Sequence, residues 1–205
     1  MKLLLTGFEP FGGSDINPSE QVVNTLADKK YPDLILVTTI LPVDREKGPQ
    51  RLIQEIKENQ PEAVICLGEA RGRVGFSIER IAINLLDYSI EDNAGNLIQD
   101  RSIIPDGPSA YFCSLPVRKI LEAVQDIGVP AALSLSAGAF LCNQVFYTLL
   151  HYLDINGLEI PAGFIHLPSL PQQVAHEQPN KPSMSIETMK IGIEAIIKCI
   201  RSELA

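Results

Sequence analysis

The sequence predicts an α/β sandwich with a largely parallel central sheet. Short runs of leucine, isoleucine and valine alternate along the chain with longer segments of helical periodicity, and such alternation is typical of this class. Several apolar runs lack alternating polar residues, as expected for strands that helices cover on both faces. A chain of 205 residues is long enough for a core of its own, so a single domain over residues 1–205 is expected.

The individual elements follow from these patterns. Strands are predicted at residues 2–7, 34–41, 63–68, 131–136 and 163–167. Helices are predicted near residues 18–30, 46–59, 114–127, 141–155 and 184–203. Pro61, Gly128 and Gly157 follow three of these helices as ordinary stop signals. Pro116 is expected inside the first turn of the third helix, where its missing N–H costs little.

Two segments interrupt this alternation. Residues 77–104 have the pattern of extended chain with a turn at Asp92–Asn96, which favours a hairpin-like excursion at the edge of the sheet. Residues 167–183 contain four prolines and are expected to form a long irregular loop. Long loops in compact domains are often functional.

Composition and charge exclude several classes of function. The formal net charge is −8, so neither nucleic acid nor an anionic membrane is an expected partner. No apolar run approaches the ~20 residues that cross a bilayer, and the start "MKLLLTGFEPFGG" has too short an apolar core for a signal peptide. A cytoplasmic location is therefore expected. The cysteines form no CxxC pair, so no metal site and no disulfide framework is predicted.

The expected sheet direction indicates where to look for functional side chains. Ligands of parallel α/β folds collect outside the carboxyl ends of the strands. If the predicted strands are parallel, four stretches meet at one edge: "GFEPFGG", "GEARGR", "AGAFLCN" and "HLPSLP".

Cys142 is the candidate nucleophile. It stands at the start of the helix that follows "AALSLS", where free N–H groups favour negative charge, lower the pKa of a thiol and can bind an oxyanion. The alternative is a small apolar residue in the core. Cys66 and Cys199 are expected in the core, and Cys113, also near a helix start, is the rival candidate.

A cysteine nucleophile needs a base, and the chain has three histidines. His151 is nine residues beyond Cys142 on the same predicted helix and should not reach the sulfur. His176 lies in the proline-rich segment, where a solvated surface residue is expected. His166 closes a strand at the expected ligand edge and is either the base or a structural histidine.

A third group should orient the imidazole. Glu79 is a carboxylate within an otherwise apolar segment, and burial of a carboxylate is costly unless it is paired. Two pairings are open at this point. Glu79 either forms a surface pair with Arg80 or is buried against His166.

Five segments together resemble a known family. "TGFEPFGG", "ERIAIN", "GPSAYFCSLP", "SAGAFLCNQVFYTLLH" and "GFIHLP" stand in the order found in pyroglutamyl peptidase of type I, also called pyrrolidone carboxyl peptidase. The similarity runs from residue 3 to about residue 171, and the C-terminal helix fits as well. The resemblance implies a three-layer α/β/α open sandwich with a mostly parallel, mixed central sheet. It also implies a cytosolic homotetramer.

The resemblance further implies an activity and a site. The family consists of cysteine exopeptidases that remove an N-terminal pyroglutamyl residue from peptides through a thioester, with no metal or organic cofactor. Its catalytic residues match Cys142, His166 and Glu79. Positions assigned to substrate binding match Phe8, Phe11, Glu69 and Asn17, and the two phenylalanines would wall a pocket for the lactam ring.

The chain departs from the family pattern at several positions. "GEARGR" stands where the family commonly has "GQAGGR", so Glu69 replaces a glutamine, and Arg71 or Arg73 is expected to pair with it. Ser89 stands in place of an arginine and Ala139 in place of a threonine. These differences predict a divergent member with altered or weakened pyroglutamyl specificity.

Two other functions compete with this hypothesis. The first is a catalytically weak or inactive member that binds a small molecule or peptide, which the retained Cys142, His166 and Glu79 argue against. The second takes "TGFEPFGG" as a phosphate loop, but its glycine spacing is not GxGxxG and no Walker sequence follows.

Overall fold

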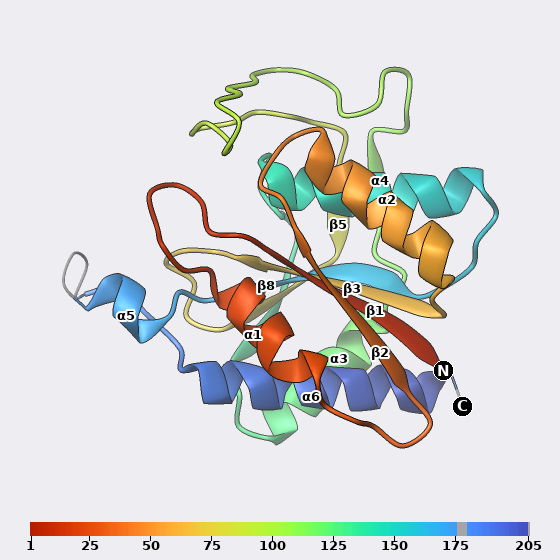
Figure 1. Ribbon diagram of the computed structural model, residues 1–205, viewed down its shortest axis with the longest axis vertical. Helices are drawn as coiled ribbons and strands as arrows, with labels where there is room; N and C mark the ends of the chain where they lie inside the picture. The colour runs from red at the N-terminus through yellow and green to blue at the C-terminus, as the bar shows by residue number, and fades with distance from the viewer. Residues whose placement is uncertain (176–179, 205) are drawn as a thin grey trace.

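The computed structural model describes residues 1–175 and 180–204. The protein is built around a six-stranded sheet with the order β2-β1-β3-β8-β4-β7. Helices cover both faces of this sheet (Figure 1), which confirms the expected three-layer α/β/α sandwich with a mostly parallel, mixed sheet. The strands are β1 (Lys2–Phe8), β2 (Ile35–Leu41), β3 (Ala63–Glu69), β4 (Phe76–Glu79), β7 (Ala131–Ser134) and β8 (Ala162–Leu167).

The helices divide between the two faces. Helices α2 (Lys47–Asn59) and α4 (Leu141–Ile155) pack together on one face. Helices α1 (Pro18–Ala27), α3 (Val117–Asp126) and α6 (Ile186–Glu203) lie on the other (Figure 1). The core accordingly has two halves. All residues of β3 and β8 are buried, as expected for strands covered on both sides.

The predicted helices are all present; α4 has the predicted bounds, and the others have one or both ends shifted. Helix α1 ends at Ala27, before the predicted residue 30. Helix α3 begins at Val117, so Pro116 stands at the N-cap and not inside the first turn. The backbone of Pro116, with φ −73° and ψ 67°, is not helical.

The strand before Cys142 runs opposite to the predicted direction. Strand β4 pairs with β8 in the antiparallel sense and with β7 in the parallel sense, so β4 and β7 both oppose β1, β3 and β8. The expectation that all carboxyl ends meet at one edge is therefore wrong for residues 131–136. The connection from β3 to β4, residues 70–75, is too short for the crossover that a parallel strand requires.

The segment 77–104 is only partly as predicted. The turn at Asp92–Asn96 is confirmed, because the Oδ1 atom of Asp92 accepts from the backbone N–H of Asn96 at 2.9 Å. The edge position is wrong for its first strand, since β4 lies inside the sheet. Strand β5 (Ile81–Ile83) instead pairs with β6 (Ala110–Phe112) in a separate two-stranded sheet.

The segment 167–183 is not wholly irregular. A short helix, α5 (Pro171–Val174), follows β8, and the side chain of Gln173 accepts from the N–H of Leu170 at 2.7 Å. His176, expected on the surface, lies outside the described residues. None of the helices in the described ranges is long and apolar enough to cross a membrane.

Candidate functional site

Cys142 is the second residue of helix α4, as predicted. Phe140 occupies the N-cap in extended conformation, and its side chain makes no capping hydrogen bond. The N–H groups of the first turn are therefore left without a side-chain cap and face outward from a positive helix end. The sulfur is held where these donors are available.

The two residues after Cys142 tie the helix start to neighbouring segments. The amide of Asn143, which is fully buried, accepts from the N–H of Ile83 at 2.9 Å and donates to the carbonyls of Ile83 and Leu85. The amide of Gln144 accepts from the hydroxyl of Tyr88 at 2.6 Å and donates to the carbonyl of Arg45. Sequence patterns did not indicate these anchors, because their partners are distant in the chain and most are backbone atoms.

The sulfur of Cys142 lies over strand β3 of the central sheet, at Gly68. A β-carbon on Gly68 would come within 2.9 Å of the Sγ atom of Cys142 and 2.8 Å of the ring of Phe164. Gly68 on β3 is the register partner of His166 on β8. Side chains that are two residues apart on a strand share a face, so Phe164 and His166 face α4 together. The nucleophile and base candidates are thereby brought to one face.

His166 is oriented by Glu79, which settles the two pairings left open by the sequence. The Nδ1 atom of His166 lies 2.8 Å from the Oε1 atom of Glu79, and their side chains are 5% and 0% exposed. This bond assigns the N–H to Nδ1 and leaves Nε2 free to accept a proton. Glu79 does not form the alternative surface pair with Arg80. It forms an ion pair with Arg73 at 2.7 Å.

The protonation states oppose one sequence expectation. Burial lowers the pKa of His166 below its ordinary value of 6.5, although Glu79 acts in the other direction. Removal of the sulfur from bulk water, together with the nearby Glu79 and Glu69 carboxylates, raises the pKa of Cys142 to about 12. The prediction of a lowered thiol pKa is wrong, because burial and the two neighbouring carboxylates disfavour the charged form. The resting pair is a neutral thiol and a neutral imidazole.

An aromatic cluster lies next to Cys142. The ring of Phe11 lies 5.9 Å from that of Phe140, which is 4.6 Å from the ring of Tyr88. Phe11 is partly exposed, whereas Phe8 is buried and packs 6.3 Å from the ring of Phe164. Phe11 therefore presents a partly exposed apolar surface beside Phe140, whereas Phe8 belongs to the core.

Asn17 and Glu69 take part in the fold. The fully buried Asn17 caps α1, accepting from the N–H of Ser19 at 2.9 Å and donating to the carbonyl of Glu9 at 3.0 Å. Glu69 ends β3, where its carboxylate accepts from the hydroxyl of Ser169 at 2.8 Å. Contact of Asn17 and Glu69 with a substrate stays a prediction.

The charge of Glu69 is balanced within the protein. Arg71, and not Arg73, pairs with it, at 3.4 Å between Nε and Oε1. Arg71 also donates to the carbonyl of Phe11 at 3.3 Å and lies 5.4 Å above its ring. Gln173 donates to the second carboxylate oxygen at 3.2 Å. Glu69 and Arg71 thus link the loop after β1 to α5.

The remaining candidates lie elsewhere. Cys66 is fully buried, as predicted, and Cys199 packs against the core from α6. Cys113 is partly buried and its pKa is raised to about 12 by burial. His151 bonds to the hydroxyl of Tyr111 at 2.9 Å.

Ser89 and Ala139, two of the positions that depart from the family pattern, belong to segments that a backbone hydrogen bond joins. Ser89 is exposed, and the carbonyl of Ala139 accepts from the N–H of Asp87 at 3.0 Å.

The described residues contain no group of three or more histidine, cysteine, aspartate or glutamate side chains able to hold a metal ion.

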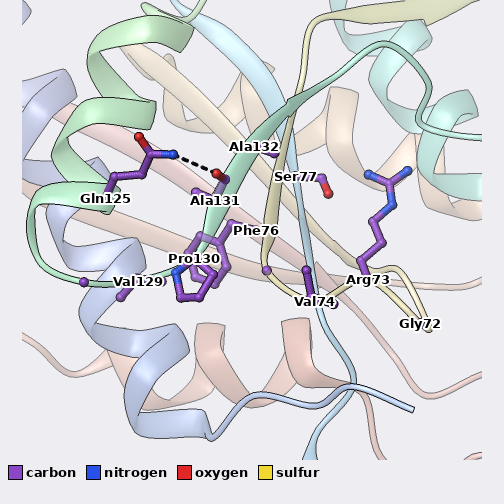
Figure 2. Close-up of a pocket in the computed structure, with 12 residues that line it drawn as sticks. Gly72, Arg73, Val74, Phe76, Ser77, Gln125, Val129, Pro130, Ala131 and Ala132 are labelled. Atoms are coloured by element: carbon purple, nitrogen blue, oxygen red, sulfur yellow. Dashed lines mark hydrogen bonds between the residues drawn. The ribbon is translucent and has the colours of Figure 1, made fainter. Parts of the chain in front are cut away.

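Two hollows lie near the site. One, of about 400 Å³, is bounded by the loop after β1, Arg71, Ser169 and α5. A larger groove of about 680 Å³ lies between the loop 72–75 and the α3–β7 connection (Figure 2). Arg73 lines this groove and reaches Glu79 from it.

Comparisons with known proteins agree on one family. A family model described as "Pyroglutamyl peptidase" matches residues 1–203. A pyrrolidone-carboxylate peptidase of Vibrio vulnificus (strain YJ016) is 44% identical over 203 residues, covering 98% of this chain and 94% of that protein. A mutant pyrrolidone carboxyl peptidase from Pyrococcus furiosus has a TM-score of 0.96 at 40% identity, with complete coverage of both chains. The pyroglutamyl peptidase I structure from Bacillus amyloliquefaciens has a TM-score of 0.93 at 37% identity, covering 97% of this chain and 94% of that one.

Proposed function

Because this chain belongs to the pyroglutamyl peptidase family of cysteine peptidases, we propose that it hydrolyses N-terminal pyroglutamyl residues from peptides. Cys142 is the nucleophile, His166 the general base and acid, and Glu79 the residue that orients the imidazole. The contact between His166 and Glu79, at 2.8 Å in a water-excluded environment, is the observation that supports this assignment most strongly.

The first step is attack on the pyroglutamyl carbonyl. With a thiol pKa of about 12 and a lowered imidazole pKa, the proton leaves Cys142 for Nε2 of His166 as the C–S bond forms. Glu79 accepts the Nδ1–H bond and stabilises the imidazolium without taking the proton. Attack and proton transfer are therefore coupled, and no thiolate is stored beforehand.

The uncapped first turn of α4 supports the oxyanion. Its N–H groups stand beside Cys142 and bind the charge that develops on the carbonyl oxygen. His166 then gives its proton to the departing amine, and the acyl group remains on sulfur as a thioester. Water deprotonated by His166 cleaves the thioester, releases pyroglutamate and restores the thiol.

The lactam ring fits the apolar surface near Cys142. Phe11 and Phe140 offer faces to a planar ring, and a few polar contacts at its edge are enough to orient it. Glu69 and Asn17 stabilise the wall of the pocket, because their polar atoms already form hydrogen bonds within the protein. We expect altered selectivity relative to members that carry glutamine at position 69.

The partner is a peptide that begins with pyroglutamate. We further propose a cytoplasmic homotetramer, as the family resemblance implies. The acidic composition, with a net charge of −8, supports a peptide substrate over nucleic acid.

One assay tests the proposed function. Wild-type protein and Cys142→Ser are compared on pyroglutamyl-aminomethylcoumarin, with prolyl-aminomethylcoumarin as the substrate that lacks the lactam carbonyl. Release from the pyroglutamyl substrate alone, lost in Cys142→Ser, is expected. Equal rates for the two proteins would refute the nucleophile, and equal rates on the two substrates would refute the specificity.

A further inference from the structure

The two oxygens of the Glu79 carboxylate differ in their hydrogen bonds. Its Oε1 atom contacts both the Nδ1 atom of His166 at 2.8 Å and the Nη1 atom of Arg73 at 2.7 Å. Its Oε2 atom is buried, and within the described residues it has no hydrogen-bond partner. One oxygen therefore serves two donors, and any change in one bond alters the strength of the other.

Arg73 joins this carboxylate to the segment that leads to the nucleophile. Its guanidinium also donates to the hydroxyl of Ser134 at 3.3 Å and to the carbonyl of Ser136 at 2.9 Å. Ser134 is the last residue of β7, and Ser136 lies in the connection from β7 to α4. Figure 2 shows the side chain of Arg73 extending from the loop at Gly72, on the side away from Pro130. The guanidinium thus connects three segments that meet at the site.

We propose that Arg73 is a positioning residue of the reaction. It holds the Glu79 carboxylate against His166 and offsets the charge of that carboxylate at the imidazole. The inference rests on the proposed function, in which His166 must be neutral before it takes the thiol proton.

The charges around His166 support this role. Glu79 from β4 and Arg73 from the preceding loop act on the imidazole in opposite directions, the carboxylate raising its pKa and the guanidinium lowering it. Cys142, at the start of α4, lies over Gly68, the register partner of His166, and burial raises its pKa, so the thiol is uncharged at neutral pH. Glu69, at the end of β3, is paired with Arg71. Arg73 is therefore the cation that offsets Glu79.

The first test measures the imidazole and needs no turnover. The pKa of His166 is followed by NMR titration of the histidine rings in the wild type, Arg73→Gln and Arg80→Gln, with His151 as internal reference. Arg80→Gln removes an equal charge next to Glu79 in sequence, from a side chain that makes no ion pair with any described residue.

The pKa of His166 should differ between the two arginine variants. In Arg73→Gln the pKa of His166 rises by about half a pH unit to one unit, because a guanidinium that is 33% exposed is partly screened by solvent. In Arg80→Gln it stays within a few tenths of a unit. An unchanged His166 pKa in folded Arg73→Gln overturns the proposal.

The second test uses the reaction. The acid limb of kcat/KM should move to higher pH in Arg73→Gln in step with the NMR titration, with kcat reduced about tenfold or more and KM little changed. Arg73→Lys keeps the charge but cannot reach Glu79 and Ser136 together, so its acid limb should stay in place while kcat falls.

These outcomes distinguish the two proposals. A wild type that does not hydrolyse pyroglutamyl substrates refutes the proposed function, and the NMR titration still decides whether Arg73 sets the His166 pKa. If Arg73→Gln fails to fold, Arg73→Lys carries the test. A folded Arg73→Lys with the kcat of the wild type overturns the positioning role.

Discussion

The sulfur of Cys142 lies directly above the backbone of Gly68, where a β-carbon would come within 2.9 Å of it. Because Gly68 is the register partner of His166, the sulfur lies above the β3 position that pairs with the candidate base. Gly68 does not have the positive φ that favours glycine. The reason for a glycine here is therefore the lack of space for a β-carbon.

Gly68→Ala should therefore reduce both activity and stability. The added methyl would also meet the ring of Phe164 at 2.8 Å, and overpacking of this kind costs ~1–3 kcal/mol. We expect kcat to fall by at least tenfold as the sulfur is displaced. Denaturant unfolding and steady-state kinetics check the two effects.

A second substitution separates these effects. Gly68→Ala combined with Phe164→Leu relieves the contact with the ring and leaves the contact with the sulfur. Stability should recover in part while kcat stays low. A double variant with the kcat of the Phe164→Leu single variant would contradict the geometric role of Gly68.

Glu79→Gln should lower kcat by ~10²–10⁴-fold while the fold persists. A glutamine amide can present its NH2 group to Nδ1 and favour the tautomer that lacks a free acceptor at Nε2. The matched control is Glu55→Gln on α2, where a buried carboxylate pairs with Arg51 far from the site. The control should lose some stability and keep its kcat. Equal kcat in Glu79→Gln and the wild type would contradict the orienting role.

The raised thiol pKa and lowered imidazole pKa predict a particular pH dependence. His166 acts only when neutral, and its pKa lies below 6.5, so kcat/KM should remain high at pH 6.5 and fall only in more acidic solution. With the pKa of Cys142 near 12, iodoacetamide should alkylate the resting enzyme slowly at pH 7 and faster as pH rises.

The alkylation experiment can also contradict the raised pKa of Cys142. Labelled peptides identified by mass spectrometry report the rate at Cys142, with Cys199 as a reference thiol in the same molecule. Fast labelling at Cys142 that is independent of pH between 6 and 9 would reveal a stored thiolate, as the helix position alone predicted.

Asn143→Ala should destabilise the protein by ~2–4 kcal/mol, because three buried hydrogen bonds to the segment 83–85 are lost. The start of α4 would also be less constrained, so activity should fall at temperatures well below the unfolding midpoint. Asn156→Ala, at the exposed other end of α4, is the control and should change stability by less than ~1 kcal/mol. Equal midpoints for the two variants would contradict the anchoring role.

Glu69 and Arg71 should behave as a coupled pair. Glu69→Gln leaves a single amide oxygen to accept from the donors Ser169 and Gln173 and should lower the free energy of unfolding by ~1 kcal/mol. In an Arg71→Ala background the same change should lower the free energy of unfolding by a smaller amount. The difference should be ~0.5 kcal/mol or below, because Arg71 is 42% exposed and its charge is screened. A double-mutant cycle in denaturant measures the coupling. Strict additivity would show that the two substitutions are independent.

Local patterns were enough to predict most elements and the family. The alternation of apolar runs and helical segments predicted the sandwich, and the position of Cys142 at a helix start followed from the turn before "LCNQVF". The five motif segments predicted the family, which the match over residues 1–203 confirms. These features are local, so neighbouring residues carry the signal.

The direction of the last strands and the contacts of the charged groups were decided by tertiary structure. Strand β7 opposes β8 because a short connection before β4 reverses the chain, and no residue within β7 encodes that direction. Arg71 pairs with Glu69, a choice that the sequence left open between Arg71 and Arg73. Arg73 pairs with Glu79, which the sequence did not predict.

The pKa of Cys142 shows the same division most clearly. The sequence by itself determined that this thiol begins a helix, where the dipole favours a thiolate. Only the packed structure decided that the sulfur is removed from water and faces carboxylates from other strands. Desolvation depends on every segment that closes over an atom, and those segments come from distant parts of the chain.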